Sequence, residues 1–219
     1  GRFSRNPEPL PHHLGALCTA VRRFGADIGF AQDPDADRLA CVTETGTPAG
    51  EEFTLVLAAE SALARGRTPV VVNLSTSALM EIVARRWNVP IYRAPVGEAN
   101  VAEKMRKVGA GFGGEGNGGV IWSRVHTGRD SFVGMALILD FLTKENVPLS
   151  AILSRYPAYV IMKEKWEVAP EQVPVVMERA KRHYRRHPVD LTDGVRVVLD
   201  DGWIHIRPSG TEPVIRLIV

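Results

Sequence analysis

The sequence is poor in cysteine and in net charge, and it has no long apolar run. Cys18 and Cys41 are its only cysteines. Both lie in apolar surroundings, so no disulfide framework is expected and a cytoplasmic, reducing compartment is the default. The 27 basic and 25 acidic residues leave a formal charge of +2, which is too little to predict a nucleic-acid or membrane partner. No apolar run approaches the roughly 20 residues that span a bilayer, and we expect no signal peptide.

The sequence does contain enough apolar material for the core of a soluble protein. Hydrophobic residues make up 45% of the 219 positions, which suffices for two compact units. The first residue is glycine rather than methionine. We therefore expect a processed product or a piece of a longer protein.

Apolar runs and periodic apolar stripes alternate along the first 157 residues. Short apolar or β-branched runs predict strands, and stripes at three- and four-residue steps predict helices. The predicted order is helix 14–24, strands 27–32 and 39–42, helix 51–65, strand 70–74, helix 76–87, strand 90–93, helix 100–109, strand 120–122 and helix 129–143. This alternation predicts α/β units with a parallel sheet.

The pattern changes after residue 157. A helix over 170–186 is followed by strands at 195–199 and 203–207, which flank the hairpin turn Asp-Asp-Gly, and by a strand at 214–219. These elements predict a smaller α+β domain with an antiparallel sheet. Boundaries near residues 66 and 158 then divide the chain into three predicted domains, 1–66, 67–157 and 158–219.

Three carboxylates stand at alternate positions in the segment 33–38, Asp-Pro-Asp-Ala-Asp-Arg. They repel one another unless a cation lies among them, and a divalent metal is the usual one. A strand that leads directly into this loop places the metal at the end of the strand, where Arg38 can hold a phosphate oxygen. The alternative is a solvated acidic turn, which Pro34 would also favour.

The same spacing matches the start of a calcium-binding EF-hand loop, with Glu44 at the twelfth position. Arg38, however, occupies the sixth position, where that loop needs glycine. The preceding run 27–31 is typical of a strand rather than of the entering helix. A calcium module remains an alternative that requires Glu44 at the site.

A glycine-rich run, 113–119, carries one carboxylate and one amide. It has neither the GxGxxG arrangement after a first strand nor the lysine of a P-loop, so it gives little support for nucleotide binding. We expect a floppy loop in which Glu115 and Asn117 bind vicinal hydroxyls of a sugar. A glycine-rich hinge with an incidental Glu115 is the alternative.

The third constellation is the segment 207–213, Arg-Pro-Ser-Gly-Thr-Glu-Pro, with Arg216 following it. Its prolines exclude a helix interior, while its backbone N–H groups and two hydroxyls can turn toward one anion. Arg207 and Arg216 supply charge-assisted contacts. These features predict a phosphate site, against the alternative of a plain surface turn.

Metal, hydroxyl and phosphate sites on three successive units indicate a phosphosugar held between domains. In this order, the motifs Asp-x-Asp-x-Asp-Arg, Gly-Glu-x-Asn-Gly-Gly and Arg-Pro-Ser-Gly-Thr-Glu-Pro resemble those of the α-D-phosphohexomutase family. Its members are four-domain enzymes that isomerise hexose 1- and 6-phosphates. The resemblance runs through essentially all 219 residues. It implies three α/β domains followed by a smaller domain with an antiparallel sheet.

The resemblance also implies roles for individual residues. One magnesium ion would bind to Asp33, Asp35 and Asp37, with Arg38 close to the transferring phosphoryl group. The sugar hydroxyls would be contacted by Glu115 and Asn117. The non-reacting phosphate would be held by Arg207, Ser209, Gly210, Thr211 and Arg216. In this family a phosphoserine passes its phosphoryl group to the sugar phosphate. The resulting bisphosphate reorients and returns its other phosphoryl group to the serine.

The sequence departs from the family pattern in two respects. It has no Ser-His-Asn-Pro-like segment, because the segment 4–7, Ser-Arg-Asn-Pro, resembles one only superficially. This segment precedes Pro-Glu-Pro, as the middle of the family's second domain does, so Ser4 is rejected as the nucleophile. The whole first domain, with its phosphoserine, the start of the second domain and the family's final helix are expected to be missing. Gly119 stands where many members have histidine. Arg93, at a strand end, is our candidate for proton transfer, with a structural arginine or a role for His126 as alternatives.

These inferences predict the C-terminal portion of a magnesium-dependent phosphohexomutase, an isomerase that acts on hexose or hexosamine phosphates as an intact phosphoprotein. The sugar loop favours phosphoglucosamine mutase or phosphomannomutase. The chain alone is expected to be inactive. The alternative is a non-catalytic metal- and phosphosugar-binding fragment or subunit that works only with a separate N-terminal chain. The sequence leaves the preferred hexose and the formation of a homodimer open.

Overall fold

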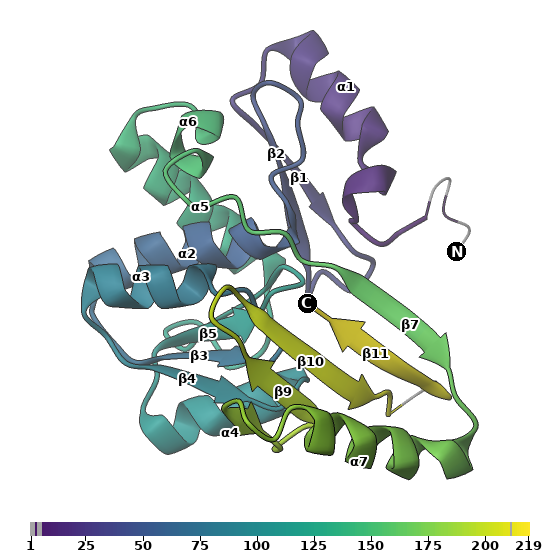
Figure 1. Ribbon diagram of the computed structural model, residues 1–219. Helices are drawn as coiled ribbons and strands as arrows, with labels where there is room; N and C mark the ends of the chain where they lie inside the picture. The colour runs from purple at the N-terminus through teal and green to yellow at the C-terminus, as the bar shows by residue number, and fades with distance from the viewer. Residues whose placement is uncertain (1–2, 4–5, 211) are drawn as a thin grey trace. The chain divides into compact units, whose positions relative to one another are not determined.

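The computed structural model describes residues 3, 6–210 and 212–219. The chain divides into two compact units, residues 1–158 and 159–219, whose helices and strands are labelled in Figure 1. Among the helices described, none is long and apolar enough to cross a membrane. A four-stranded sheet with parallel pairs in the first unit and a five-stranded antiparallel sheet in the second confirm the predicted fold class.

The first unit begins with a helix packed on a β-hairpin. Its elements are η1 (Pro11–His13), α1 (Gly15–Phe24), β1 (Ile28–Gln32) and β2 (Leu39–Thr43). Helix α1 ends at Gly25, whose left-handed backbone (φ 59°) suits glycine. Cys18 and Val21 of α1 lie in one buried cluster with Val42 of β2. The antiparallel pairing of β1 with β2 leaves the 33–38 loop at the tip of the hairpin.

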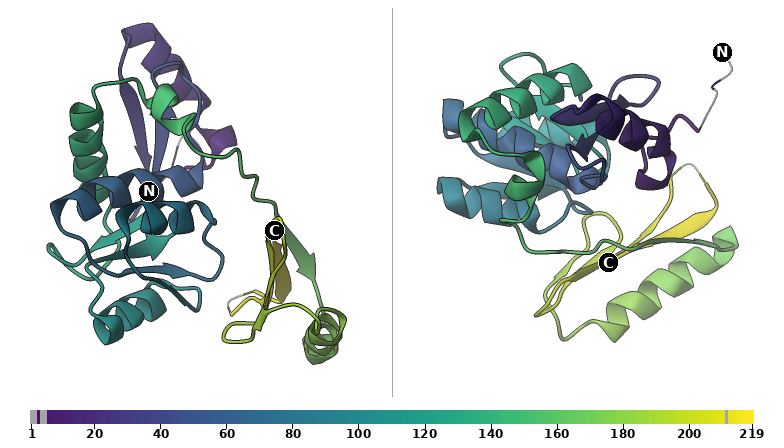
Figure 2. Two further views of the ribbon diagram at one scale, coloured as in Figure 1. Left: turned by 60° about the vertical axis from the view of Figure 1, so that its left-hand side comes forward. Right: turned by 90° about the horizontal axis from the view of Figure 1, so that it is seen from above.

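The rest of the first unit is a helix and sheet sandwich. Its elements are α2 (Glu51–Arg65), β3 (Val70–Asn73), α3 (Leu79–Trp87), β4 (Ile91–Ala94), α4 (Glu98–Val108), β5 (Phe112–Glu115), β6 (Gly119–Trp122), α5 (Ser131–Glu145) and α6 (Leu149–Leu153). The strand order is β4-β3-β5-β6; β3 is parallel to both of its neighbours, and β6 is antiparallel to β5. Helices α2 and α3 cover one face of the sheet and α4 covers the other (Figures 1 and 2).

The apolar run of strand β3 is continuous because the strand is buried on both faces. Val70 and Val72 face the cluster that contains residues of α2 and α3, whereas Val71 faces the cluster that contains residues of α4. Strands buried on both faces need apolar side chains at every position. Because residues of α2 lie in the same cluster as Val70 and Val72, helix α2 shares its core with the parallel sheet.

The glycine-rich run is not the floppy loop that the sequence predicts. Gly113 and Gly114 continue β5, and the chain turns at 116–118 into β6. A Cβ atom on Gly114 would lie 2.1 Å from the carbonyl oxygen of Gly119, and one on Gly113 would lie 2.6 Å from that of Val71. The prediction of a loop is wrong here because these glycines serve close strand packing rather than flexibility.

The second unit is an antiparallel sheet with one helix packed on it. Its elements are β7 (Lys163–Glu167), η2 (Pro170–Gln172), α7 (Val173–His183), β8 (Val189–Asp190), β9 (Val195–Val198), β10 (Trp203–Pro208) and β11 (Val214–Ile218). The strand order is β7-β11-β10-β9-β8. Ala180 of α7 packs against Val195 and Val197, with Ile206 beside them.

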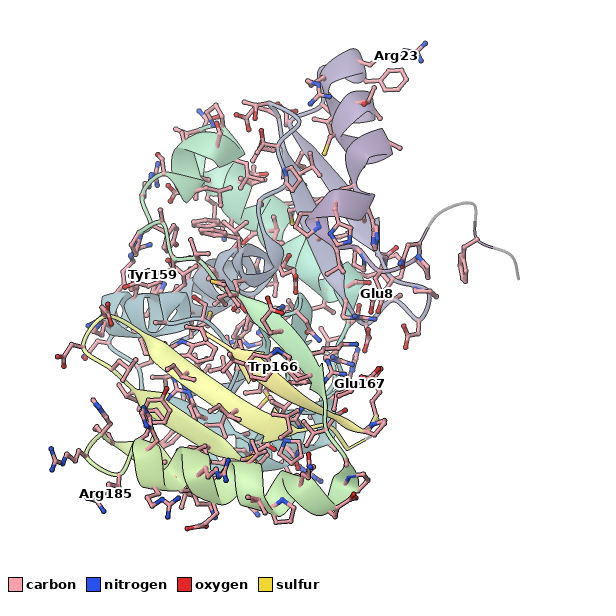
Figure 3. All side chains as sticks on the ribbon, turned by 45° about the vertical axis from the view of Figure 1, so that its right-hand side comes forward. Glu8, Arg23, Tyr159, Trp166, Glu167 and Arg185 are labelled. Carbon is pink, nitrogen blue, oxygen red and sulfur yellow. The ribbon has the colours of Figure 1, made fainter. Side chains whose placement is uncertain are left out.

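Strand β7 has no counterpart among the sequence predictions. Its sequence, Lys-Glu-Lys-Trp-Glu, lacks an apolar alternation, and all five residues are exposed; Trp166 and Glu167 are labelled on it in Figure 3. Charged side chains are common on edge strands because they oppose unwanted pairing.

Candidate functional site

The 33–38 loop is built around the carboxylate of Asp33. Its Oδ1 accepts hydrogen bonds from the backbone N–H groups of Asp37 (3.1 Å) and Arg38 (3.0 Å), and its Oδ2 accepts one from Arg38 Nε (2.7 Å). The Asp33 side chain is fully buried, and that of Arg38 is 28% exposed. Asp33 therefore shapes the turn and holds Arg38 at the hairpin tip.

The three aspartates of the loop converge. One carboxylate oxygen from each of Asp33, Asp35 and Asp37 lies within 4.8 Å of the others. Burial opposes ionisation of Asp33, but hydrogen bonds from Asp37 and Arg38 lower its pKa to about 2. Burial and the neighbouring Asp33 raise the pKa of Asp37 to about 6, against the attraction of the Arg129 guanidinium. Opposite shifts of this kind arise when adjacent carboxylates cannot all hold charge together.

The donor set suits a hard divalent cation. Carboxylate oxygens are the ligands that Mg²⁺, Ca²⁺ and Mn²⁺ prefer. Within the described part of the chain, Asp37 Oδ1 is buried and has no hydrogen-bond partner, although Arg38 Nε lies 3.6 Å from it, while Asp37 Oδ2 accepts a hydrogen bond from Arg129. A buried carboxylate oxygen without a partner is costly, and a cation among the three aspartates would satisfy it. The residues present therefore fit a divalent metal.

Glu44 lies away from this cluster. It follows β2 at the end of the hairpin remote from the 33–38 loop. Its carboxylate accepts hydrogen bonds from the backbone N–H (3.2 Å) and the hydroxyl of Ser150, and these bonds lower the pKa of Glu44 although burial opposes them. The EF-hand alternative requires Glu44 beside the aspartates, and this arrangement contradicts it.

Glu115 ends β5 and is only 3% exposed. Its Oε1 accepts hydrogen bonds from Asn73 Nδ2 (2.7 Å) and from the backbone N–H of Gly97 (2.9 Å), and its Oε2 accepts one from Arg129 Nη1 (2.7 Å). Asn73 ends β3 and Gly97 precedes α4, so Glu115 joins segments along the carboxyl edge of the parallel strands. Ligands of open α/β sheets bind at this edge.

Asn117 lies in the turn that joins β5 to β6. It is half-buried, and its Oδ1 accepts a hydrogen bond from the backbone N–H of Gly119 at 3.3 Å. The backbone of this turn also contacts the hairpin, because Leu39 N–H donates to the carbonyl of Gly118 (3.1 Å). The structure thus brings the predicted sugar loop, residues 113–119, next to the predicted metal loop, residues 33–38.

Arg129 connects these two loops through its side chain. Its guanidinium donates to Asp37, to Glu115 (2.7 Å) and to Glu98 (3.2 Å). The sequence prediction misses Arg129 and Glu98 because neither lies in a recognised motif. A usable signal for Glu98 is its position at the start of α4, just beyond the short connection 95–97 that follows the parallel strand β4.

Arg93 is engaged in contacts that anchor the chain. Its Nη1 donates to the backbone carbonyls of Asn73 (2.9 Å) and Thr76 (2.8 Å), and its Nε and Nη2 donate to Glu81. Only 13% of the side chain is exposed. This arrangement supports the structural alternative for Arg93 over proton transfer.

His126 supports the start of α5. Its Nε2 lies 2.8 Å from Asp130 Oδ2, and its Nδ1 accepts a hydrogen bond from the backbone N–H of Gly128. Asp130 in turn caps the helix by accepting hydrogen bonds from its first backbone N–H groups.

In the second unit, three cationic residues form a row across neighbouring strands. Arg207 on β10 is paired with Arg216 on β11, which is paired with Lys165 on β7. Residues directly opposite each other point to the same face of a sheet. Arg207 Nε donates to both carboxylate oxygens of Asp193 (3.2 and 3.1 Å), and Arg216 Nη2 donates to Glu212 (2.6 Å).

The loop after Arg207 is closed by a backbone hydrogen bond from Ser209 N–H to the carbonyl of Val214 (2.9 Å). A Cβ atom on Gly210 would meet nothing within 4 Å, while Thr211 lies outside the described residues. Lys165 is missed by the sequence prediction because its strand is missed. The row of positive charges beside this loop suits an anion such as phosphate.

Comparison with protein families accounts for nearly the whole chain. The model described as "Phosphoglucomutase/phosphomannomutase, alpha/beta/alpha domain II" matches residues 1–46, the one for domain III matches 50–159, and the one for the C-terminal domain matches 159–219. The chain belongs to the phosphohexomutase family. The resemblance carried by the three sequence motifs is thereby confirmed.

Relatives in the phosphohexomutase family are longer than this chain. A protein named "Probable phosphoglucosamine mutase" from Methanopyrus kandleri is 40% identical over 223 residues, covering 100% of this chain and 49% of that protein. A protein named "Phosphoglucomutase/phosphomannomutase" from Thermococcus kodakarensis is 34% identical over 220 residues, covering 99% of this chain and 48% of that protein. The chain thus spans about half the length of the curated relatives it matches.

Solved phosphohexomutase structures share the fold. A phosphoglucomutase/phosphomannomutase family protein from Burkholderia thailandensis aligns with a TM-score of 0.83 and 26% identity, over 97% of this chain and 46% of that one. N-acetylphosphoglucosamine mutase from Aspergillus fumigatus, described in complex with GlcNAc-6P and magnesium, aligns with a TM-score of 0.60 and 14% identity, over 86% of this chain and 47% of that one. At that identity the second likeness shows the fold alone.

Proposed function

We propose that this chain is part of a magnesium-dependent phosphohexomutase that interconverts the 1- and 6-phosphates of a hexose or hexosamine through a sugar bisphosphate. One observation carries the proposal. In a chain of this family, three carboxylates converge at a hairpin tip, and Asp37 Oδ1 is buried there without a hydrogen-bond partner among the described residues. The names of the relatives favour phosphoglucosamine mutase or phosphomannomutase as the activity.

Asp33, Asp35 and Asp37 would hold one Mg²⁺. When bound, the ion offsets negative charge on the transferring phosphoryl group. Arg38 adds a fixed positive charge beside it, because its Nε is held by Asp33 while 28% of its side chain is exposed. A guanidinium held in this way can stabilise the transition state without reorganising.

Glu115 and Asn117 would recognise the sugar hydroxyls. Glu115 already accepts three hydrogen bonds, and an ionised carboxylate has about four acceptor sites. One site therefore remains for a hydroxyl, and the existing bonds hold that site in place. Asn117 is half-buried in the adjacent turn and can both donate and accept.

The non-reacting phosphate would bind in the second unit. The residues proposed for it are Arg207, Ser209, Gly210, Thr211 and Arg216, with Lys165 as a further cation in the same row. Hydrogen bonds to Asp193 and Glu212 restrain the guanidinium groups of Arg207 and Arg216. A fixed distal phosphate would restrain the reacting oxygen, and such positioning can supply much of a rate enhancement.

The phosphoryl carrier, a phosphoserine, is proposed to come from outside these 219 residues. The matched family models are those of domains II, III and the C-terminal domain. Ser4, rejected above as the nucleophile, lies outside the described residues. The intact enzyme would work in the cytoplasm as a phosphoprotein, and the 219-residue chain alone would not turn over.

The proposal is tested by following conversion of glucosamine 6-phosphate, mannose 6-phosphate and glucose 6-phosphate by ³¹P NMR in the presence of Mg²⁺. The chain is assayed alone and then with an added N-terminal fragment that carries a phosphoserine domain. We expect no turnover alone and turnover of at least one substrate with the fragment. Turnover by the chain alone contradicts an external nucleophile. Binding of a hexose phosphate without turnover in either assay favours the non-catalytic subunit.

A further inference from the structure

Arg129 lies in the connection between β6 and α5, outside every sequence motif. Its side chain is 16% exposed, and each guanidinium nitrogen donates to a different carboxylate. Nη2 binds Asp37, Nη1 binds Glu115 at 2.7 Å and Nε binds Glu98 at 3.2 Å. Its backbone N–H also donates to Glu98, at 3.1 Å. One planar group therefore ties together three segments of the first unit.

The stem of Arg129 is confined as tightly as its guanidinium. A Cβ atom on Gly119 would come within 2.3 Å of Arg129 Cδ, so the stem fills the space that a larger residue at position 119 would need. Next to Arg129, the backbone N–H and hydroxyl of Ser131 donate to the carbonyl of Ala36 (3.0 and 2.7 Å). The chain around Arg129 is thus docked directly on the metal loop.

The contact with Asp37 decides which carboxylate oxygen is left for a cation. Arg129 holds Oδ2, and Oδ1 is the buried oxygen that lacks a hydrogen-bond partner among the described residues. A carboxylate held at one oxygen cannot rotate freely about its last bond. Ligands of a metal are commonly oriented by such outer contacts, whose loss costs about 10–100-fold in metal affinity.

We propose that Arg129 is a positioning residue that presents Asp37 to the metal and couples metal binding to the order of the sugar loop, residues 113–119, which here comprises the end of β5, the turn 116–118 and the start of β6. The inference rests on the metal site proposed above. Restraint of Asp37 by a metal passes through one guanidinium to Glu115, which ends β5 directly before the turn 116–118. The metal loop and the sugar loop therefore act as one element.

The choice of variant depends on two effects with opposite signs. Replacing Arg129 by an apolar residue removes the tether, which weakens metal binding, but it also removes a positive charge near a dication, which strengthens it. Arg129→Lys keeps the charge and loses the planar fork that grips several carboxylates at once. Arg124→Lys is the matched control. Arg124 lies in the same connection, and its described contacts are with the backbone of Arg65 and the ring of Trp122 rather than with these carboxylates.

The experiment measures the Kd of Mn²⁺ for the 219-residue chain by calorimetry, and amide hydrogen exchange over residues 113–119 with and without Mn²⁺. In the wild-type chain, Mn²⁺ should slow exchange in this loop. Arg129→Lys should raise the Kd at least tenfold and abolish the slowing, while Arg124→Lys should behave as wild type.

The outcomes separate this inference from the proposed function. If the wild-type chain does not bind Mn²⁺, the proposed metal site fails. If it binds, but Arg129→Lys keeps the wild-type Kd or Mn²⁺ leaves exchange of the wild-type loop unchanged, only the role of Arg129 is overturned. Should Arg129→Lys fail to fold, Glu98→Asp serves instead, because it keeps the negative charge but shortens the side chain that holds Arg129. It should raise the Kd and reduce the slowing, and wild-type values would overturn the inference.

Discussion

Replacing Glu115 by glutamine should destabilise the first unit, even in the absence of any sugar. The carboxylate is buried and accepts from Asn73, Gly97 and Arg129. Glutamine has one oxygen and one NH₂ group, so a donor must face a donor whichever way the amide turns. The less costly orientation keeps Asn73 and Gly97 on the oxygen and loses the bond to Arg129.

The loss can be estimated from the hydrogen bonds concerned. A bond to a charged group contributes about 1.5–3 kcal/mol, and the two bonds that remain become weaker because their acceptor is no longer charged. Arg129 keeps Asp37 and Glu98 as partners, which limits the penalty. The expected total is about 2–3 kcal/mol, or roughly 4–12 °C in Tm for a chain of this size.

Urea unfolding of the 219-residue chain, followed by tryptophan fluorescence and by hydrogen exchange of first-unit amides, measures this loss. Asn117→Ala is the control, because the described hydrogen bond of its side chain is a long one, to Gly119, and it should cost less than about 1 kcal/mol. If Glu115→Gln falls within about 0.5 kcal/mol of wild type, the network is wrong and Glu115 is incidental to a glycine-rich hinge.

Further predictions concern the phosphate loop, a strained turn and acid stability. In the enzyme assembled with a phosphoserine domain, Arg207→Met should raise KM for the hexose phosphate about tenfold or more, because it removes a charge-assisted contact; an unchanged KM would remove the phosphate assignment. Gly194→Ala should destabilise the second unit to urea by more than about 1 kcal/mol, because Gly194 has φ 80° and its Cβ would lie 2.3 Å from the backbone oxygen of Ile206. Gly202→Ala is the control, because a Cβ at position 202 would meet nothing within 4 Å. Equal stabilities of these two variants would contradict the prediction. Hydrogen bonds from Lys144 and two other side chains lower the pKa of Asp140 to about 2, so its stabilising effect is complete above about pH 4 and is lost as the pH falls toward 2. Asp140→Asn should flatten the acid fall in Tm over that range, and identical profiles would refute the assignment.

The fold could be predicted wherever burial leaves a local pattern. The valines of β3 and the stripe of α1 are examples, because each side chain meets the core at a regular step. Strand β7 leaves no such pattern, since its five residues are exposed and its conformation depends on pairing with β11. In β5, glycines selected by close strand packing are indistinguishable from loop glycines in the sequence alone.

The candidate site divides in the same way. Convergence of Asp33, Asp35 and Asp37 follows from their spacing within one turn, whereas Arg129 reaches Asp37 from 92 residues away in the chain. Contacts over such separations depend on the whole topology. The individual roles of the site residues and the division into domains 1–66, 67–157 and 158–219 remain predictions, although helix α2 shares its core with the parallel sheet.

Anomalous diffraction from crystals of the chain grown with Mn²⁺ would show where the metal binds. We expect one strong anomalous peak at the hairpin tip, within coordination distance of carboxylate oxygens from Asp33, Asp35 and Asp37, with Asp37 Oδ1 among them. A peak elsewhere, or none at saturating Mn²⁺, would contradict the proposed metal site.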